Sequence, residues 1–170
     1  MDKYQEKRSF IGKFMFNFIL KCNTFLSKHL WLYYLLNYTW GILTVLFGYI
    51  ILGFIHIFLK NKIADKGTFG PCYFIQLGNN WGGLELGINF ILADNMGEKW
   101  TLHTKQHELG HTFQNAILGP FFIFLVSIPS AIRYWLHRFN KLNHDYDFAW
   151  FEGSASYFGE YYYNNYIVKK

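Results

Sequence analysis

The stretch TLHTKQHELGHTFQNA, residues 101–116, decides how this chain folds and what it can bind. It contains no proline and shows helical spacing, which predicts a helix that ends near Gly119-Pro120, since proline interrupts helices. His107 and His111 are four residues apart, so they lie on one face of that helix. Their imidazole nitrogens converge on one point, and such nitrogens are good ligands for a metal ion.

The five residues from His107 to His111 resemble the HExxH motif of the zincins, a family of zinc peptidases. The resemblance implies that His107 and His111 bind Zn²⁺ and that Glu108 is the general base for a zinc-bound water. The alternative is an exposed helix with two unrelated histidines. Apolar flanking residues argue against that alternative, because buried ionisable groups cost free energy unless they are paired or bind a metal.

A catalytic zinc site needs a third protein ligand and an open position for water. Downstream, the segment FAWFEGSAS, residues 148–156, resembles the helix that carries the third ligand in the gluzincins, the zincins with a glutamate ligand. By that resemblance Glu152 is the third ligand, and Glu160, further along roughly the same face, is its rival. Ser156 falls where many gluzincins have an aspartate that orients a ligand histidine.

Other polar residues near the motif have ordinary alternatives. His103, one turn before His107, is expected in a supporting position or at the helix start. His137, His144 and Tyr157 have the chemistry to stabilise an oxyanion, but surface positions suit them equally. The spacing 103–107–111 also suggests a di-iron lipid hydroxylase, but those enzymes need adjacent His-His pairs, which this chain lacks.

The composition points to a membrane. The chain is 52% apolar and only 16% charged, whereas soluble domains carry about 25% charged residues. Leu30–Leu59 contains no Asp, Glu, Lys or Arg, and about 20 apolar residues suffice for a span. We expect a tilted transmembrane helix there, densest at Gly41–Leu59, or a span continued by an interfacial turn; a buried helix of a soluble protein is the alternative. Upstream, the spacing of Phe10–Leu26 predicts an amphipathic helix, either on the bilayer or packed on the protein.

The charge distribution agrees with this expectation. The net charge is +5, and basic residues precede the uncharged stretch, as the positive-inside rule and an anionic lipid surface favour. We therefore expect the lipid bilayer as a partner, a location in the cell membrane, and no nucleic acid. Cys22 and Cys72 lack the spacing of a disulfide framework or a thiolate zinc site.

The middle of the chain predicts a β-hairpin. Asp65–Gly70 has the composition of a loop, and Cys72–Leu77 that of a strand. The glycine-rich stretch Gly78–Gly83 predicts a turn, and Leu84–Leu92 alternates between apolar and other residues over its length. Alternation with period two indicates a strand, so we expect two antiparallel strands joined by the turn.

A second uncharged run, Ala116–Ile132, contains Pro120 and Pro129 and is at the short limit for a span. A straight crossing would separate His107 from Glu152 by about 30 Å. Both could not then bind one ion, so we expect this run to be bent or re-entrant.

The chain also resembles a group of uncharacterised bacterial membrane proteins over residues 75–160. The matching motifs are Trp81–Gly87, His107–His111, Leu118–Pro120, Ile128–Ser130 and Glu152–Ala155. That resemblance implies topology and site positions, and no substrate.

We therefore expect a mainly α fold with a short antiparallel β-hairpin, a membrane-associated and minimal version of the zincin fold. Residues 1–66 would hold the amphipathic helix and transmembrane segment, and 67–170 the zincin-like part. The expected function is a zinc-dependent hydrolase, specifically a metallopeptidase acting on peptides or proteins. The alternative is a non-catalytic membrane protein with a structural or partner-binding zinc site.

Overall fold

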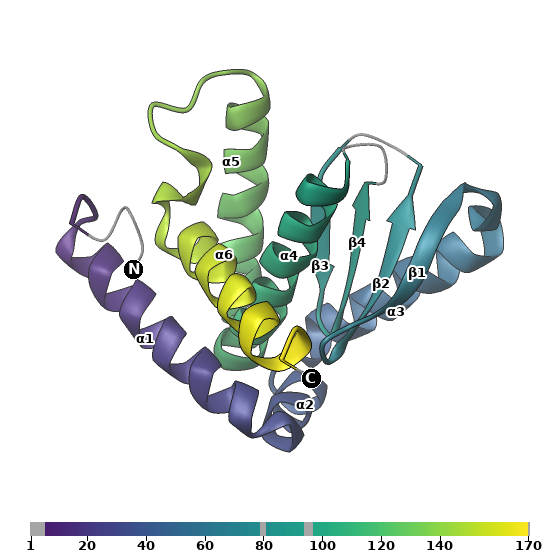
Figure 1. The fold of residues 1–170 in the computed structure, drawn as a ribbon, viewed down its shortest axis with the longest axis horizontal. Coiled ribbons are helices and arrows are strands. Elements are labelled where there is room, and N and C mark those ends of the chain that lie inside the picture. The colour runs from purple at the N-terminus through teal and green to yellow at the C-terminus, as the bar shows by residue number, and fades with distance from the viewer. Residues whose placement is uncertain (1–5, 79–80, 94–96, 170) are drawn as a thin grey trace.

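The computed structural model describes residues 6–78, 81–93 and 97–169. These residues form a mainly helical chain with a small mixed sheet (Figure 1), so the predicted helical class is confirmed. The helices are α1 (Phe10–Lys28), α2 (Leu30–Thr39), α3 (Ile42–Phe58), α4 (Glu98–Leu118), α5 (Ile128–Arg138) and α6 (Trp150–Tyr162). The strands are β1 (Ile63–Phe69), β2 (Cys72–Leu77), β3 (Gly83–Leu86) and β4 (Asn89–Ala93).

The sheet has the strand order β1-β2-β4-β3, and the predicted hairpin is wrong. The predicted strand Leu84–Leu92 breaks at Gly87 into β3 and β4, which pair antiparallel with each other. The other predicted strand, β2, pairs parallel with β4 and antiparallel with β1. Of the predicted turn 78–83, residues 79–80 lie outside the described residues.

Burial explains why the alternation was misleading. Every residue of β4 is buried, because the two faces of the sheet are covered by different helices. Phe90 belongs to one hydrophobic cluster with Phe113 of α4, and its neighbour Ile91 belongs to another with Leu52 of α3. A strand covered on both faces is apolar on both, and in β4 only Asn89 is polar; the alternation over Leu84–Leu92 comes from reading through the turn at Gly87.

The predicted loop Asp65–Gly70 is also wrong, because these residues belong mostly to β1, an edge strand. Asp65 and Lys66 are exposed there. Edge strands commonly carry charges, which discourage pairing with other chains. The composition of an edge strand is therefore easily mistaken for that of a loop.

The predicted single helix over Leu30–Leu59 divides into α2 and α3, whose axes are bent by 84°. The bend lies at Gly41, which packs against the Asn115 side chain of α4. Asn115 Nδ2 also donates a hydrogen bond to Asn37 Oδ1 at 2.7 Å. Among the described residues, no helix taken alone has the length and apolar character to cross a bilayer, and only the bent pair of α2 and α3 meets that criterion jointly.

The predicted N-terminal helix forms as α1 and contacts both α6 and α4, so it packs on the part of the chain that carries the HExxH-like motif. Phe16, Ile19 and Leu26 are buried in these contacts, while Phe14 and Phe18 are exposed. The apolar residues of α1 therefore occupy two faces.

Helix α4 ends at Leu118, directly before Gly119-Pro120, as predicted. The chain then turns back through a π-helix, Ile123–Ser127, and α5 runs beside α4 (Figure 1). This reversal returns the chain to the side of α4 that carries His107 and His111.

Candidate metal centre

The centre lies where α4 and α6 meet, and glycines set the distance between these helices. A β-carbon at Gly110 of α4 would overlap the backbone of Ala155, and one at Gly159 of α6 would overlap the backbone of Gln106. The two helices are thus in backbone contact. That contact lets the Glu152 side chain reach both histidine rings.

The structure brings His107, His111 and Glu152 together, all buried. The Nε2 atoms of the two rings are 3.0 Å apart. Glu152 Oε2 lies 3.1 Å from His107 Nε2 and 3.3 Å from His111 Nε2. Ligand atoms around a tetrahedral zinc, with bonds of about 2.0–2.1 Å, are about 3.3 Å apart. The three atoms therefore lie close to the positions that such an ion requires.

Hydrogen bonds fix the tautomer of His107. Its Nδ1 lies 2.8 Å from Ser156 Oγ, and Ser156 Oγ donates its own hydrogen to Asp147 Oδ1 at 3.0 Å. A hydroxyl has one hydrogen, so Ser156 accepts from the Nδ1–H of His107. Nε2 of the neutral ring then presents its lone pair to the centre.

His111 is fixed in the same sense by Gln114. Its Nδ1 lies 2.8 Å from Gln114 Oε1. The Gln114 amide is oriented by its Nε2, which donates to the Phe151 carbonyl at 2.7 Å and to Ser154 Oγ at 2.9 Å. An amide oxygen only accepts, so Nδ1 of His111 is the donor and its Nε2 also presents a lone pair.

Three acceptor atoms therefore converge, and a positive charge is needed between them. Glu152 Oε1 is buried and has no hydrogen-bond partner among the described residues. Without a metal, a proton supplies the charge: burial disfavours a charged His111 ring, but the hydrogen bond and charge of Glu152 outweigh it and raise the pKa of His111 to about 9. Burial likewise opposes the Glu152 charge, yet the adjacent His107 and His111 rings outweigh it and hold the pKa of Glu152 far below its usual range. The group can hold a metal ion in place of that proton.

Glu108 is not one of the three converging groups, but it lines the same cavity. It lies against the start of β3, where a β-carbon at Gly83 would overlap its carboxylate. Burial raises the pKa of Glu108, although the charges of both histidines and a backbone hydrogen bond from Glu85 oppose the shift.

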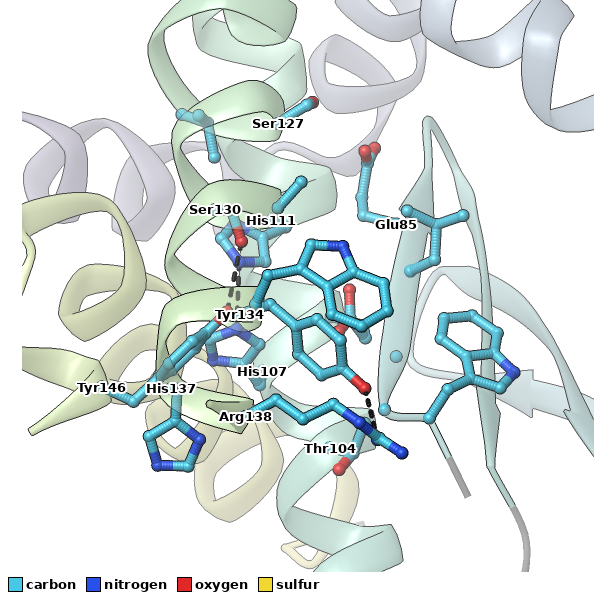
Figure 2. A pocket seen from close by; sticks show the side chains of 18 of the residues that line it. Glu85, Thr104, His107, His111, Ser127, Ser130, Tyr134, His137, Arg138 and Tyr146 are labelled. Carbon is cyan, nitrogen blue, oxygen red and sulfur yellow. Dashed lines mark hydrogen bonds between the residues drawn. The ribbon is translucent and has the colours of Figure 1, made fainter. Parts of the chain in front are cut away.

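The cavity has a volume of about 740 Å³ and lies between β3, α4 and α5. Figure 2 shows Ser130, Tyr134, His137 and Arg138 of α5 on the same side of the cavity as His107 and His111; Arg138 is hydrogen-bonded to the Tyr134 hydroxyl, and Tyr146 lies beside Ser130. Much of the lining is aromatic: Trp81, Trp100, Phe122, Tyr134, Trp135 and Tyr146. The centre thus opens into a largely apolar cavity that is large enough for an apolar group of a bound molecule.

The remaining predicted residues separate into two sets. His103 and His137 line the cavity. His144 instead lies tilted against the Phe148 ring, and Tyr157 packs edge-on against Phe16. Glu160 is exposed and outside the converging group, so the arrangement favours Glu152 as the carboxylate ligand.

Glu85 and Tyr146 are among the cavity residues that were missed at the sequence level. Glu85 is buried on β3, and its Oε1 accepts a hydrogen bond of 2.6 Å from the amide of Gly87. Burial raises the pKa of Glu85 well above its usual value. An acidic residue between Leu84 and Leu86 was a signal that could have been read. Tyr146, whose hydroxyl lies 3.3 Å from Ser130 Oγ, has no such signal because its loop has no regular pattern.

Comparison of the chain with protein-family models, with curated proteins and with solved structures finds no match.

Proposed function

We propose that the protein is a membrane-associated, zinc-dependent hydrolase, a metallopeptidase of the gluzincin type. The observation that carries the proposal is the convergence of three acceptor atoms from His107, His111 and Glu152 beside the buried carboxyl of Glu108. A structural ion would need the three ligands, but it would not need an acidic residue on the cavity side.

Zinc is the metal that we assign to the centre. Two imidazoles and one carboxylate are a common ligand set of catalytic zinc, which keeps its fourth position open. The His107 and His111 side chains border the cavity, so that position is accessible to a substrate. When bound, zinc would supply Lewis acidity, which polarises a carbonyl and makes a water more acidic.

Proton transfer is then carried out by the protein's own side chains. Glu108 takes a proton from the attacking water and returns it to the leaving amine. A raised pKa suits this role, because a base works best near the ambient pH. Burial also raises the pKa of Tyr146, so its hydroxyl stays protonated and can donate to the substrate oxygen.

A peptide substrate suits the shape of the site. β3 is an edge strand, and Gly83, Leu84 and Glu85 line the cavity. An extended peptide can add to such an edge through main-chain hydrogen bonds while its side chains enter neighbouring pockets.

The surface supports association with a bilayer. Exposed large apolar residues lie on α1, α2, α3, α5 and the segment between α4 and α5, and the ring of Trp40, directly after α2, lies near the Phe121 ring of that segment. Examples are Phe14, Phe18, Trp31, Phe47, Ile50, Phe54, Phe124 and Ile132. Monomeric soluble proteins rarely expose apolar patches above a few hundred Å². Lys21 and Lys28 are exposed on α1 and complement anionic headgroups.

The test uses detergent-purified full-length protein and the variant Glu108→Gln. We expect stoichiometric zinc in both proteins by elemental analysis, and a loss of peptide-library cleavage by about 10²–10⁴-fold in the variant. Glu98→Gln, the same change at an exposed position of α4, serves as the control and should leave cleavage unchanged. Loss of zinc in Glu108→Gln would contradict the role of Glu108 as a base.

A second candidate is a non-catalytic membrane protein that keeps zinc for structure or for binding a partner. The observation in its favour is the burial of all three ligands, which structural sites share. Stoichiometric zinc without cleavage of any library peptide would favour this candidate over the hydrolase.

A further inference from the structure

The two ligand histidines differ in what supports them, and the difference identifies a residue outside the motif. His111 donates to a neutral amide, Gln114, on its own helix. His107 donates to Ser156, whose hydroxyl donates to the Asp147 carboxylate. Resting on the proposed metal site, we propose that Asp147 is a positioning residue for His107 that acts through the Ser156 hydroxyl, and that Arg8 holds Asp147 in place.

The link between Asp147 and His107 is continuous. Ser156 Oγ lies 2.8 Å from His107 Nδ1 and 3.0 Å from Asp147 Oδ1. A carboxylate that accepts a hydrogen bond from a ligand histidine fixes its tautomer and strengthens it as a donor to the metal. Here the hydroxyl of Ser156 extends the reach of the carboxylate by one group. Many gluzincins have an aspartate at the position of Ser156, and here Asp147 supplies the carboxylate through the Ser156 hydroxyl.

Arg8 connects this pair to the beginning of the chain. Its side chain is 5% exposed. Arg8 Nε donates to the Phe148 carbonyl at 2.8 Å, and Nη2 donates to the Asp147 carbonyl at 2.7 Å. Both acceptors are backbone atoms of the turn that precedes α6. The guanidinium thus fixes the backbone that carries the Asp147 carboxylate.

Two further contacts hold the arginine itself. Its guanidinium lies over the Phe16 ring of α1, 4.4 Å from the centroid. The guanidinium also lies against Gly153, where a β-carbon would overlap Nη2. Gly153 follows the ligand Glu152, so Arg8 packs directly against the first turn of the ligand helix.

The turn is also held by α5. Arg133 of α5 donates from Nε to the Tyr146 carbonyl at 2.6 Å, and from Nη2 to the Asp145 carbonyl. Two arginines from distant parts of the chain therefore bind consecutive carbonyls of one turn. With its backbone fixed, that turn can present Asp147 to Ser156 and Tyr146 to the cavity.

The first experiment measures zinc affinity by competition with a chelator, on full-length protein in detergent. We expect Ser156→Ala and Asp147→Asn each to weaken zinc binding by about 10–100-fold, as for other supporting residues of metal ligands. Glu98→Gln also removes a carboxylate, at an exposed position of α4, and should have no effect. The double variant Asp147→Asn/Ser156→Asp places a carboxylate next to His107 and should restore the affinity to within a few-fold of wild type.

The second experiment detects the link without any metal. In ¹⁵N-histidine NMR spectra of the metal-free protein, the Nδ1 proton of His107 should be observed as a hydrogen-bonded resonance protected from exchange. Ser156→Ala should remove that protection, and Asp147→Asn should shift the resonance. The His111 Nδ1 resonance, held by Gln114, should be unchanged in both variants.

These outcomes separate the two proposals. If wild-type protein binds zinc and both single variants bind it within twofold, the link from Asp147 is overturned while the metal site stands. If wild-type protein binds no zinc, the proposed function fails, and the NMR experiment still decides whether Asp147 positions His107. A failure of the double variant to recover affinity, with its fold intact by circular dichroism, would also count against the link.

Discussion

Helices α5 and α6 border the same centre but are attached to the protein in different ways. α6 lies in backbone contact with α4, and Glu152, Ser154, Ala155 and Phe158 are buried along it. α5 has no buried residue. It is tied to the turn before α6 by the hydrogen bonds of Arg133 and by the contact of Ser130 with Tyr146. The side that supplies the ligands is thus fixed by close packing, whereas the cavity wall depends on a few polar contacts.

The largest expected effects come from changes in α6, and the first of these separates it from α4. Gly159→Ala would place a methyl group on the backbone of Gln106, which cannot move without shifting the helix. We expect it to lower the free energy of unfolding by about 3 kcal/mol, the upper end for overpacking. Thermal unfolding in detergent measures this change.

The control for that substitution is Gly53→Ala in α3, where a β-carbon would meet nothing within 4 Å. Alanine is favoured over glycine inside a helix by about 1 kcal/mol, so the control should be neutral or stabilising. Equal melting temperatures for the two variants would contradict the close approach of α4 and α6.

The next effect concerns the ligand on α6. Glu152→Gln removes the negative charge but keeps the size of the side chain, so zinc affinity should fall by more than about 100-fold, beyond the loss expected for a supporting residue. Glu160→Gln, on the exposed part of the same helix, should keep its zinc. Elemental analysis after gel filtration distinguishes the two. Zinc retained in Glu152→Gln and lost in Glu160→Gln would move the third ligand to Glu160.

A pH effect follows from the proton that occupies the ligand side of the centre without metal. The pKa of His111 is raised to about 9, so below that pH a zinc ion must displace a proton from the ring. Apparent zinc affinity should therefore fall roughly tenfold per pH unit from pH 8 to pH 6. Isothermal titration in two buffers of different ionisation enthalpy would also detect the released proton. An affinity independent of pH in this range would contradict the raised pKa.

The smallest effect on stability should come from α5. Ile132 is exposed on the side away from the core, so Ile132→Ser should change the free energy of unfolding by less than about 0.5 kcal/mol. It should nevertheless weaken binding to vesicles that contain anionic lipid. Phe158→Ala in α6 is the contrasting change and should cost about 3–5 kcal/mol. Sedimentation with vesicles and thermal unfolding measure the two properties separately.

The ligand pair was predictable because helical spacing alone puts His107 and His111 on one face. Glu152 was reached only through a resemblance, since no local pattern relates residues 107 and 152. The sheet was predictable only in part: a central strand buried on both faces loses its alternation, and a charged edge strand has the composition of a loop. The bend at Gly41 depends on Asn115, which comes far later in the chain, and hydropathy contains no information about such a contact.

The contact between Arg8 and the turn before α6 joins residues that are 139 and 140 positions apart. During synthesis the histidines of α4 leave the ribosome well before Glu152. Arg8 leaves it long before the Asp147 and Phe148 carbonyls to which it donates. Pairings of such long sequence separation form slowly, because loop closure must precede them. The growing polypeptide therefore has to reach α6 before the group of His107, His111 and Glu152 is complete, and any stalled or truncated product lacking α6 would lack that group.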